Sequence, residues 1–373
     1  MTTVPSSENA LLPRIGRVLL LLMTLYAFLF SIKLMGHSFK MFGEDTAERL
    51  IATTQNPFMG LAIGIFVTSL IQSSSTTTSV VVAFAAAGGL TLQNAIPIIM
   101  GANIGTTVTN AIVSLAHLTR RNEFPRAFAG AIIHDFFNIL AVVVLFPLET
   151  HFHLIEKAAR WLAHEFAGVG GTKLFNPLSV VIKPAIKAAD HAFAGLPYAH
   201  VWLLALALVL LFVALGGMVK TLRSMMVEKM QVLLGGVLFR NDLGSLLLGM
   251  VLTASVQSSS ITTSLVVPLV GAGLLTVRQI FPYVLGANVG TTITAILAAL
   301  AVEQESAEIA VTAAFAHLMF NVFAIGILWW VKFIPIRLAE SFARLAVRSK
   351  KHMAVCLMCY FTLYVLPLLL AML

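Results

Sequence analysis

The feature that most constrains the fold is a polar stretch that occurs twice, each time in the middle of an apolar run. Residues 72–79 read QSSSTTTS and residues 257–264 read QSSSITTS, an offset of 185 residues (257 − 72). The match continues beyond these polar octets, because GANIGTT at 101–107 returns as GANVGTT at 286–292 with the same offset. Such a correspondence indicates an internal repeat. We therefore expect two related units, each with its most polar residues deep in apolar surroundings.

The composition restricts the class of protein in which this repeat can occur. Of the 373 residues, 59% are hydrophobic and only 11% are charged, and the mean hydropathy is +0.94. Several apolar runs approach the ~20 residues with which a helix crosses a bilayer. These values exclude an ordinary soluble domain and predict an all-α polytopic membrane protein surrounded by lipid. The basic residues behind the formal net charge of +8 lie in loops between spans, where they set the topology, so we expect no nucleic-acid partner.

The polar octets lie in segments whose length does not suit a simple span. As one straight helix, residues 57–90 would extend about 50 Å at 1.5 Å per residue, whereas each half beside the octet would extend only about 22 Å. The apolar core of a bilayer is ~30 Å thick. Two half-helices that meet in mid-membrane and return to the same side satisfy both lengths. We therefore predict re-entrant helical hairpins, each with a QSSS motif, at 57–90 and 243–275, closed by Gly88 and Gly89 in the first and by Gly271 and Gly273 in the second.

The hairpins and the other apolar runs predict the domain organisation. A polar tail (1–14) precedes repeat 1 (15–147). A connector with an amphipathic helix (148–199) leads to repeat 2 (200–331), and a basic loop with a last span (332–373) follows. The first apolar run (15–36) follows Arg14 and Arg17, as the apolar region of a signal peptide follows basic residues. It is longer than such a region and lacks a cleavage site of small residues, so we expect a span. Full spans are expected at 15–36, 94–118, 127–147, 201–219, 279–301, 309–331 and 353–372.

The loops predict that the two repeats have opposite orientations. The loop after span 94–118 contains Arg120, Arg121 and Arg126, and is therefore expected in the cytoplasm. The equivalent loop after span 279–301, residues 303–308, has three glutamates and no Lys or Arg. Equivalent loops on opposite sides of the membrane indicate inverted repeats. Counting spans from these loops places the N-terminus inside the cell and the C-terminus outside.

The breaks within the octets have the chemistry of an ion site. A half-helix that begins at the serines offers free backbone N–H groups and a positive dipole end to an anion. A half-helix that ends before Gln72 or Gln257 offers carbonyl oxygens to a cation, and hydroxyl and amide oxygens suit Na⁺. Residues 57–118 contain no Lys or Arg that could neutralise a buried oxyanion, and burying an uncompensated charge is costly. We therefore expect cations to enter with the anion, with Na⁺ as the coupling ion, no other cofactor and no transition metal.

Three further sets of residues lie in the spans outside the octets: two His–Asn pairs, one aspartate and two cysteines. His134 is followed by Asn138, and His317 by Asn321, at helical spacing, which is typical of a structural hydrogen-bonded pair. Asp135 is the one acid within a span and has no equivalent in repeat 2, where Leu318 stands. Its expected role is to anchor a hairpin or to reach the interface between the repeats. The cysteines at 356 and 359 are read as packing residues of the last span.

The doubled motif resembles the type II sodium-dependent phosphate cotransporters. The resemblance rests on the paired QSSS stretches, on GANIGTT with GANVGTT, and on RAFAGAIIHDFFN at 126–138, and it covers about residues 15–365. It implies secondary active uptake of inorganic phosphate with Na⁺ by alternating access. The connector is shorter than in animal members and lacks a cysteine pair, and little follows the last span, which resembles a bacterial, inner-membrane representative.

The resemblance also implies roles for individual residues. The resemblance implies an acidic residue, in electrogenic animal members, at the position where this chain has Thr91. Thr91 is therefore the candidate coupling position, and the Na⁺:phosphate ratio stays open. The expected phosphate ligands are Ser73, Ser74, Ser75, Ser258, Ser259 and Ser260. Residues expected to bind sodium, or to share both ions, are Gln72, Thr77, Asn103, Gln257, Thr262 and Asn288.

Three alternatives compete with a sodium–phosphate symporter. N–H groups and hydroxyls accept any small oxyanion, so a sodium-coupled symporter of sulfate or of a carboxylate stays open. A passive anion channel is the second alternative, although two hairpins that meet in mid-membrane suit a closed site better than a pore. The third is an intramembrane serine hydrolase, which needs a base beside its nucleophile. The serines occur in two equivalent sets but the acid occurs in one repeat only, so we expect no enzyme.

Overall fold

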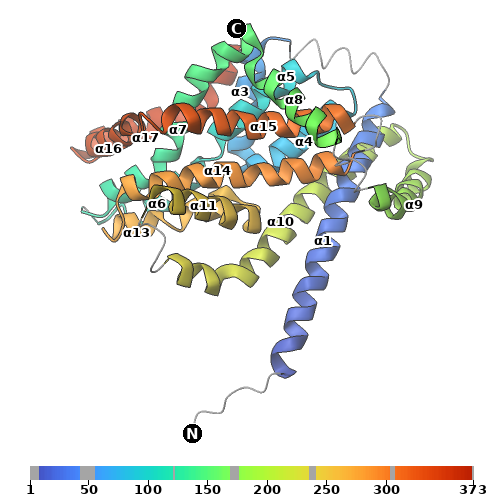
Figure 1. The fold of residues 1–373 in the computed structure, drawn as a ribbon, viewed down its shortest axis with the longest axis horizontal. Helices are drawn as coiled ribbons and strands as arrows, with labels where there is room; N and C mark the ends of the chain where they lie inside the picture. The colour runs from blue at the N-terminus through green and yellow to red at the C-terminus, as the bar shows by residue number, and fades with distance from the viewer. Residues whose placement is uncertain are drawn as a thin grey trace.

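The computed structural model describes residues 8–42, 55–120, 122–168, 176–234, 241–302 and 307–371, and every regular element within these ranges is a helix (Figure 1). The helices of the first half are α1 (Glu8–Lys40), α3 (Pro57–Ile71), α4 (Ser74–Ala86), α5 (Leu92–Gly105), α6 (Val108–Leu115), α7 (Phe124–Phe152), α8 (Leu154–Gly168) and α9 (Asn176–Phe193). Those of the second half are α10 (Ala199–Leu234), α11 (Asp242–Val256), α12 (Ser259–Ser264), α13 (Val267–Gly271), α14 (Val277–Leu300), α15 (Ala307–Leu328), α16 (Phe333–Ala346) and α17 (Lys350–Ala371).

Six segments of the described chain are long and apolar enough to cross a bilayer, which confirms the predicted all-α polytopic membrane protein. They are Ile15–Phe39, Leu92–Leu115, Phe124–Phe152, Ala199–Leu222, Val277–Leu300 and Ala307–Leu328. The last expected span, 353–372, falls on α17, which is not among the six. The N-terminal half of α1 extends beyond the packed helices (Figure 1), and its large apolar side chains, Leu19 and Met23 among them, are exposed, as lipid-facing residues are.

Both polar octets interrupt the helices in the same way. Gln72 ends α3 in the left-handed region, with φ of 57°, and its N–H donates to the Thr68 carbonyl oxygen at 2.7 Å. Ser73 then caps α4, because its side chain accepts from the Thr76 N–H. In repeat 2, Gln257 has φ of 59° and Ser258 caps α12. The same residue types therefore impose the same sharp break twice.

Glycines hold each interrupted helix against the span that follows it. α3 packs on α5, and α11 packs on α14. A Cβ atom added at Gly64 would collide with the carbonyl oxygen of Ile98, and one at Gly249 would collide with that of Tyr283. These are equivalent positions in the two copies, at the offset of 185 residues. Only glycine permits such a close backbone approach.

The connectors and turns agree with the sequence expectations only in part. An amphipathic helix was expected in the connector, and the structure has two helices there, α8 and α9, of which the sequence interpretation missed α9. Gly88 (φ 83°) and Gly273 (φ 77°) occupy left-handed turns after the second half-helices, whereas Gly271 is the last residue of α13. Several loop residues used to orient the repeats lie outside the described residues, namely Arg121 and residues 303–306.

Candidate functional site

The breaks in the two octets form the centre of the candidate site, and each contacts a segment from the other half of the chain. The Ser75 hydroxyl donates to the Gln257 carbonyl oxygen at 3.4 Å. The Ser260 hydroxyl donates to the Thr106 carbonyl oxygen at 3.3 Å. Of the six serines that the sequence singles out, Ser73 and Ser258 are half-buried and the other four are buried: Ser74, Ser75, Ser259 and Ser260.

The glutamines of the two octets bond to equivalent threonines but differ in exposure. Thr294 donates to Gln257 Oε1 at 2.5 Å, and Thr109 reaches Gln72 Oε1 at 3.4 Å. Gln257 is only 6% exposed and also donates through Nε2 to the Ala254 carbonyl oxygen at 2.7 Å. Gln72, by contrast, is exposed. The Gln72 side chain is therefore accessible at its break, whereas the Gln257 side chain is enclosed.

The threonines Thr77 and Thr262 are partly committed to their own helices. Thr77 Oγ1 donates to the Ser73 carbonyl oxygen at 3.2 Å and accepts from the Thr68 hydroxyl at 2.9 Å. Thr262 Oγ1 donates to the Ser258 carbonyl oxygen at 2.9 Å. Both hydroxyls keep acceptor capacity after donating, so they can still offer an oxygen to a cation.

Each of the two buried histidines contacts an asparagine of the other repeat. His134 Nε2 hydrogen-bonds to Asn288 Oδ1, and His317 Nε2 lies 3.4 Å from Asn103 Oδ1. Asn321 donates to the His317 backbone carbonyl oxygen at 2.9 Å, so the expected hydrogen-bonded pair occurs in repeat 2 through the backbone. In repeat 1, Asn138 donates instead to the Asn103 carbonyl oxygen at 2.8 Å. Each imidazole contacts the Asn of the GANxGTT motif of the other repeat, a long-range partner that the sequence spacing did not reveal.

Asp135 lies in a cluster that joins α7 to the C-terminal helix. Its carboxylate accepts from Tyr360 at 2.9 Å and from Tyr364 at 2.5 Å, and it also contacts the Thr107 hydroxyl. Asp135 is 2% exposed. Thr107 lies in the break between α5 and α6, directly after the residue that accepts from Ser260. The sequence interpretation missed both tyrosines, although their spacing of four residues already placed them on one face of the last helix.

Thr91 lies outside this centre. It is exposed, and its hydroxyl caps α5 by accepting from the Asn94 N–H at 3.2 Å. Thr276, its equivalent in repeat 2, caps α14 in the same way as part of a capping box with Gln279. The structure therefore gives Thr91 a local role as a helix cap.

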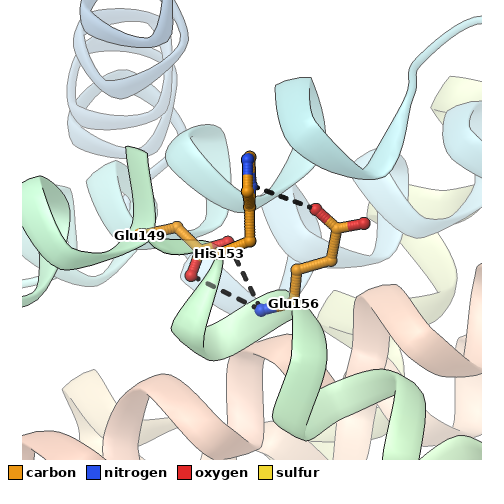
Figure 2. A group of neighbouring side chains, drawn as sticks. All are labelled: Glu149, His153 and Glu156. Carbon is orange, nitrogen blue, oxygen red and sulfur yellow. Dashed lines mark hydrogen bonds and ion pairs between the residues drawn. The ribbon is translucent and has the colours of Figure 1, made fainter. Parts of the chain in front are cut away.

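Three ionisable groups meet at the corner between α7 and α8, away from the centre (Figure 2). Glu149 caps α8 by accepting from the Ile155 N–H at 2.6 Å, and Glu156 pairs with Arg160 at 2.9 Å. His153 Nδ1 lies 3.5 Å from Glu156 Oε2, and the ligand-type atoms of the two glutamates and the histidine lie within 4.8 Å of one another. Helix capping and ion pairing account for these contacts, so the expected lack of a transition-metal site stays a prediction.

Comparison with known proteins identifies the family. The family model for the Na⁺/Pi-cotransporter matches residues 27–168 and 210–334. Sodium-dependent phosphate transport protein 2B of Pongo abelii is 31% identical over 95% of this chain and 65% of its own length. Sodium-dependent phosphate transport protein 2A of Ovis aries is 32% identical over 88% of this chain and 63% of its own length.

The chain thus spans less than two thirds of the length of these relatives. No solved structure matches it. The matched segments nevertheless include both polar octets, both GANxGTT motifs, and the buried His134 and Asp135. With more than half of its residues in the family model, the chain belongs to the Na⁺/Pi-cotransporter family.

Proposed function

We propose that the protein is a secondary active transporter that couples the uptake of inorganic phosphate to Na⁺ by alternating access. Family membership supports this, as do relatives whose names give sodium dependence and phosphate transport. The observation that carries the proposal is the pair of buried polar octets that contact each other's surroundings through Ser75 and Ser260.

We propose that the two repeats are inverted and that α3–α4 and α11–α13 are re-entrant hairpins. α3 has 15 residues and α4 has 13, which corresponds to about 22 and 20 Å. Neither length crosses a ~30 Å apolar core. The matching break geometry at Gln72 and Gln257 and the matching close contacts at Gly64 and Gly249 support a common origin. On this basis the repeats occupy 15–147 and 200–331, joined by 148–199, with the N-terminus inside the cell.

Phosphate is proposed to bind between the two breaks. The serines present hydroxyls, and the first turns of α4 and α12 present N–H groups that the capping serines do not use. Each hydrogen bond to a charged group contributes about 1.5–3 kcal/mol, which falls short of the cost of burying a bare oxyanion. The proposed phosphate ligands are Ser73, Ser74, Ser75, Ser258, Ser259 and Ser260.

Sodium is proposed to supply the missing positive charge. Asn103 and Asn288 lie at the crossing between the repeats, and Gln72, Gln257, Thr77 and Thr262 border the breaks. To these we add Asp135, because an ionisable side chain buried in a span favours a functional role. Its carboxylate, the Thr107 hydroxyl and two phenol oxygens form an oxygen-rich cluster, which suits a hard cation.

The competing functions make different demands on the same residues. A sulfate or carboxylate symporter would use the same hydroxyls, so only transport competition separates it from a phosphate symporter. A passive channel needs a continuous path, yet Gln257 is buried while Gln72 is exposed. A one-sided opening fits alternating access better. A hydrolase would need a base beside a serine, whereas the Nε2 atoms of the two buried histidines, His134 and His317, face asparagines.

The decisive experiment is uptake of radiolabelled phosphate into liposomes that contain the purified protein. We expect accumulation above equilibrium with an inward Na⁺ gradient and none with an equal K⁺ gradient. Unlabelled sulfate should compete poorly. Clamping the vesicle potential with valinomycin then measures the net charge moved, each unit of which is worth about 2.3 kcal/mol per 100 mV. Uptake at the same rate with and without Na⁺, or phosphate that only reaches equal concentrations on both sides of the membrane, would contradict the proposal.

A further inference from the structure

A cavity of about 300 Å³ lies between α1, α4 and α9, away from the breaks in the octets. Its walls include Ile32, Ala83 and Ile186, and its polar groups are concentrated on α1 and α9. A methyl group added at Gly36, on the α1 wall, would meet no atom within 4 Å. The space is therefore a real recess between helices, with apolar walls and a polar border.

Positive charge dominates the border of this cavity. Among the described residues, Lys33, Lys183 and Lys187 line it together with a single acidic residue, Asp190. Asp190 is already engaged by His37, whose Nε2 lies 2.8 Å from Oδ2 and 2.9 Å from Oδ1. Among the described lining residues, lysines therefore outnumber acids by three to one, and the one acid is already paired with a histidine.

Lys33 makes this arrangement unusual. It is only 9% exposed and lies within the apolar segment Ile15–Phe39. A lysine at such a position is costly, and in membrane proteins it marks a site for an ion or an anionic group. Lys183 and Lys187 are exposed, four residues apart on α9, so both face the same recess from its outer side.

We propose that this cavity binds a phosphate-bearing anion, with Lys33, Lys183 and Lys187 around the phosphate group. Lysine is a common phosphate ligand because its ammonium is a compact charge with three donors. Basic recesses beside membrane helices bind lipid head groups in the same way. The ligand is therefore either the head group of an anionic phospholipid, whose chain the apolar walls accommodate, or free inorganic phosphate near the hairpin of repeat 1.

The proposal is tested by binding, so it stands or falls independently of transport. The pocket variant is Lys183→Gln with Lys187→Gln, which changes two exposed side chains and should not disturb folding. The matched control is Lys350→Gln with Lys351→Gln, two exposed lysines at the start of α17 that lose the same charge outside the cavity. Lys33→Met serves as a second, stronger pocket variant.

The first arm uses nanodiscs of phosphatidylglycerol with phosphatidylcholine, from which lipids that stay bound are counted by native mass spectrometry. The second arm measures equilibrium binding of labelled phosphate in K⁺ medium. We expect the pocket variant to lose at least fivefold in one arm while the control matches the natural protein. A loss in the first arm identifies a lipid, and a loss in the second identifies free phosphate. If neither arm distinguishes the pocket variant from the control, the proposal is wrong.

Discussion

The two copies of the polar octet have nearly identical sequences, yet their surroundings differ. Thr106 and Thr107 interrupt the helix in repeat 1, whereas their equivalents Thr291 and Thr292 lie within the continuous α14. The Thr106 carbonyl oxygen accepts from Ser260, and Thr107 contacts Asp135. The same short motif thus adopts two backbone forms because its neighbours differ.

The opposite difference occurs in the second half-helices. α4 runs unbroken from Ser74 to Ala86, whereas α12 ends at Ser264 and α13 begins at Val267. Pro268 stands in repeat 2 where repeat 1 has Ala83, and proline cannot donate the helical N–H bond. This asymmetry is encoded locally, unlike the break after Gly105. The two copies therefore share the geometry of the break but differ in the helices that surround it.

The largest expected effect tests what the copies share. Gly64→Ala and Gly249→Ala should each destabilise the fold by about 3 kcal/mol or more, because overpacking against backbone cannot relax as it does against a flexible side chain. Gly326→Ala, also in a helix, meets no atom within 4 Å and serves as the control. Thermal unfolding in detergent measures all three. Equal stability of Gly64→Ala and the control would show that the close approach is not required.

Asp135 is the clearest chemical difference between the repeats. Asp135→Asn should reduce Na⁺-driven uptake by at least tenfold and lower the charge moved per phosphate, because repeat 2 has no acid to replace it. Tyr360→Phe removes one bond to the same carboxylate while keeping the charge. We therefore expect it to weaken Na⁺ affinity without changing the charge moved. Uptake currents in voltage-clamped vesicles distinguish the two, and an unchanged current in Asp135→Asn would remove this residue from coupling.

Much of this comparison could be predicted from the sequence. The breaks follow from the polar octets, and apolar length indicated all six spans of the structure, although it also indicated a seventh, 353–372, that is not among them. The link between Asp135 and α17 could not be predicted, because it joins residues more than two hundred positions apart. The same holds for the exchange of histidine partners between the repeats. Local patterns indicate which residues are polar and buried, but only packing decides which of them meet.

Smaller effects are expected at the serines. Ser74→Ala or Ser259→Ala should raise the apparent phosphate KM about 10- to 100-fold while kcat changes less, since a lost hydrogen bond to a charged group costs about 1.5–3 kcal/mol. The two variants should have similar effects if phosphate lies between the copies. Ser255→Ala is the control, because Ser255 is half-buried outside the octet and its hydroxyl donates to the Val251 carbonyl oxygen at 2.7 Å within its own helix. An effect in one repeat only would place phosphate off the axis between them.

The unequal exposure of the two glutamines predicts a difference in chemical access. In a background with both natural cysteines replaced, Gln72→Cys should react with a water-soluble maleimide on the order of tenfold faster than Gln257→Cys, because reaction requires an accessible thiolate. Adding Na⁺ and phosphate should narrow this difference if the protein alternates between two openings. Labelling rates followed by mass spectrometry provide the measurement. Equal rates in the ligand-free protein would contradict a one-sided opening.

The smallest effect is expected at Thr91, where the resemblance to electrogenic relatives predicts a coupling position. Aspartate is itself a favoured N-cap, so Thr91→Asp should preserve the start of α5 while adding a negative charge. Thr91 is exposed, and a charge in contact with water is screened, so we expect at most about a twofold change in Na⁺ dependence. Thr276→Asp, at the equivalent cap, is the control. A new cation requirement in Thr91→Asp but not in Thr276→Asp would restore Thr91 as the coupling position and reduce the role assigned to Asp135.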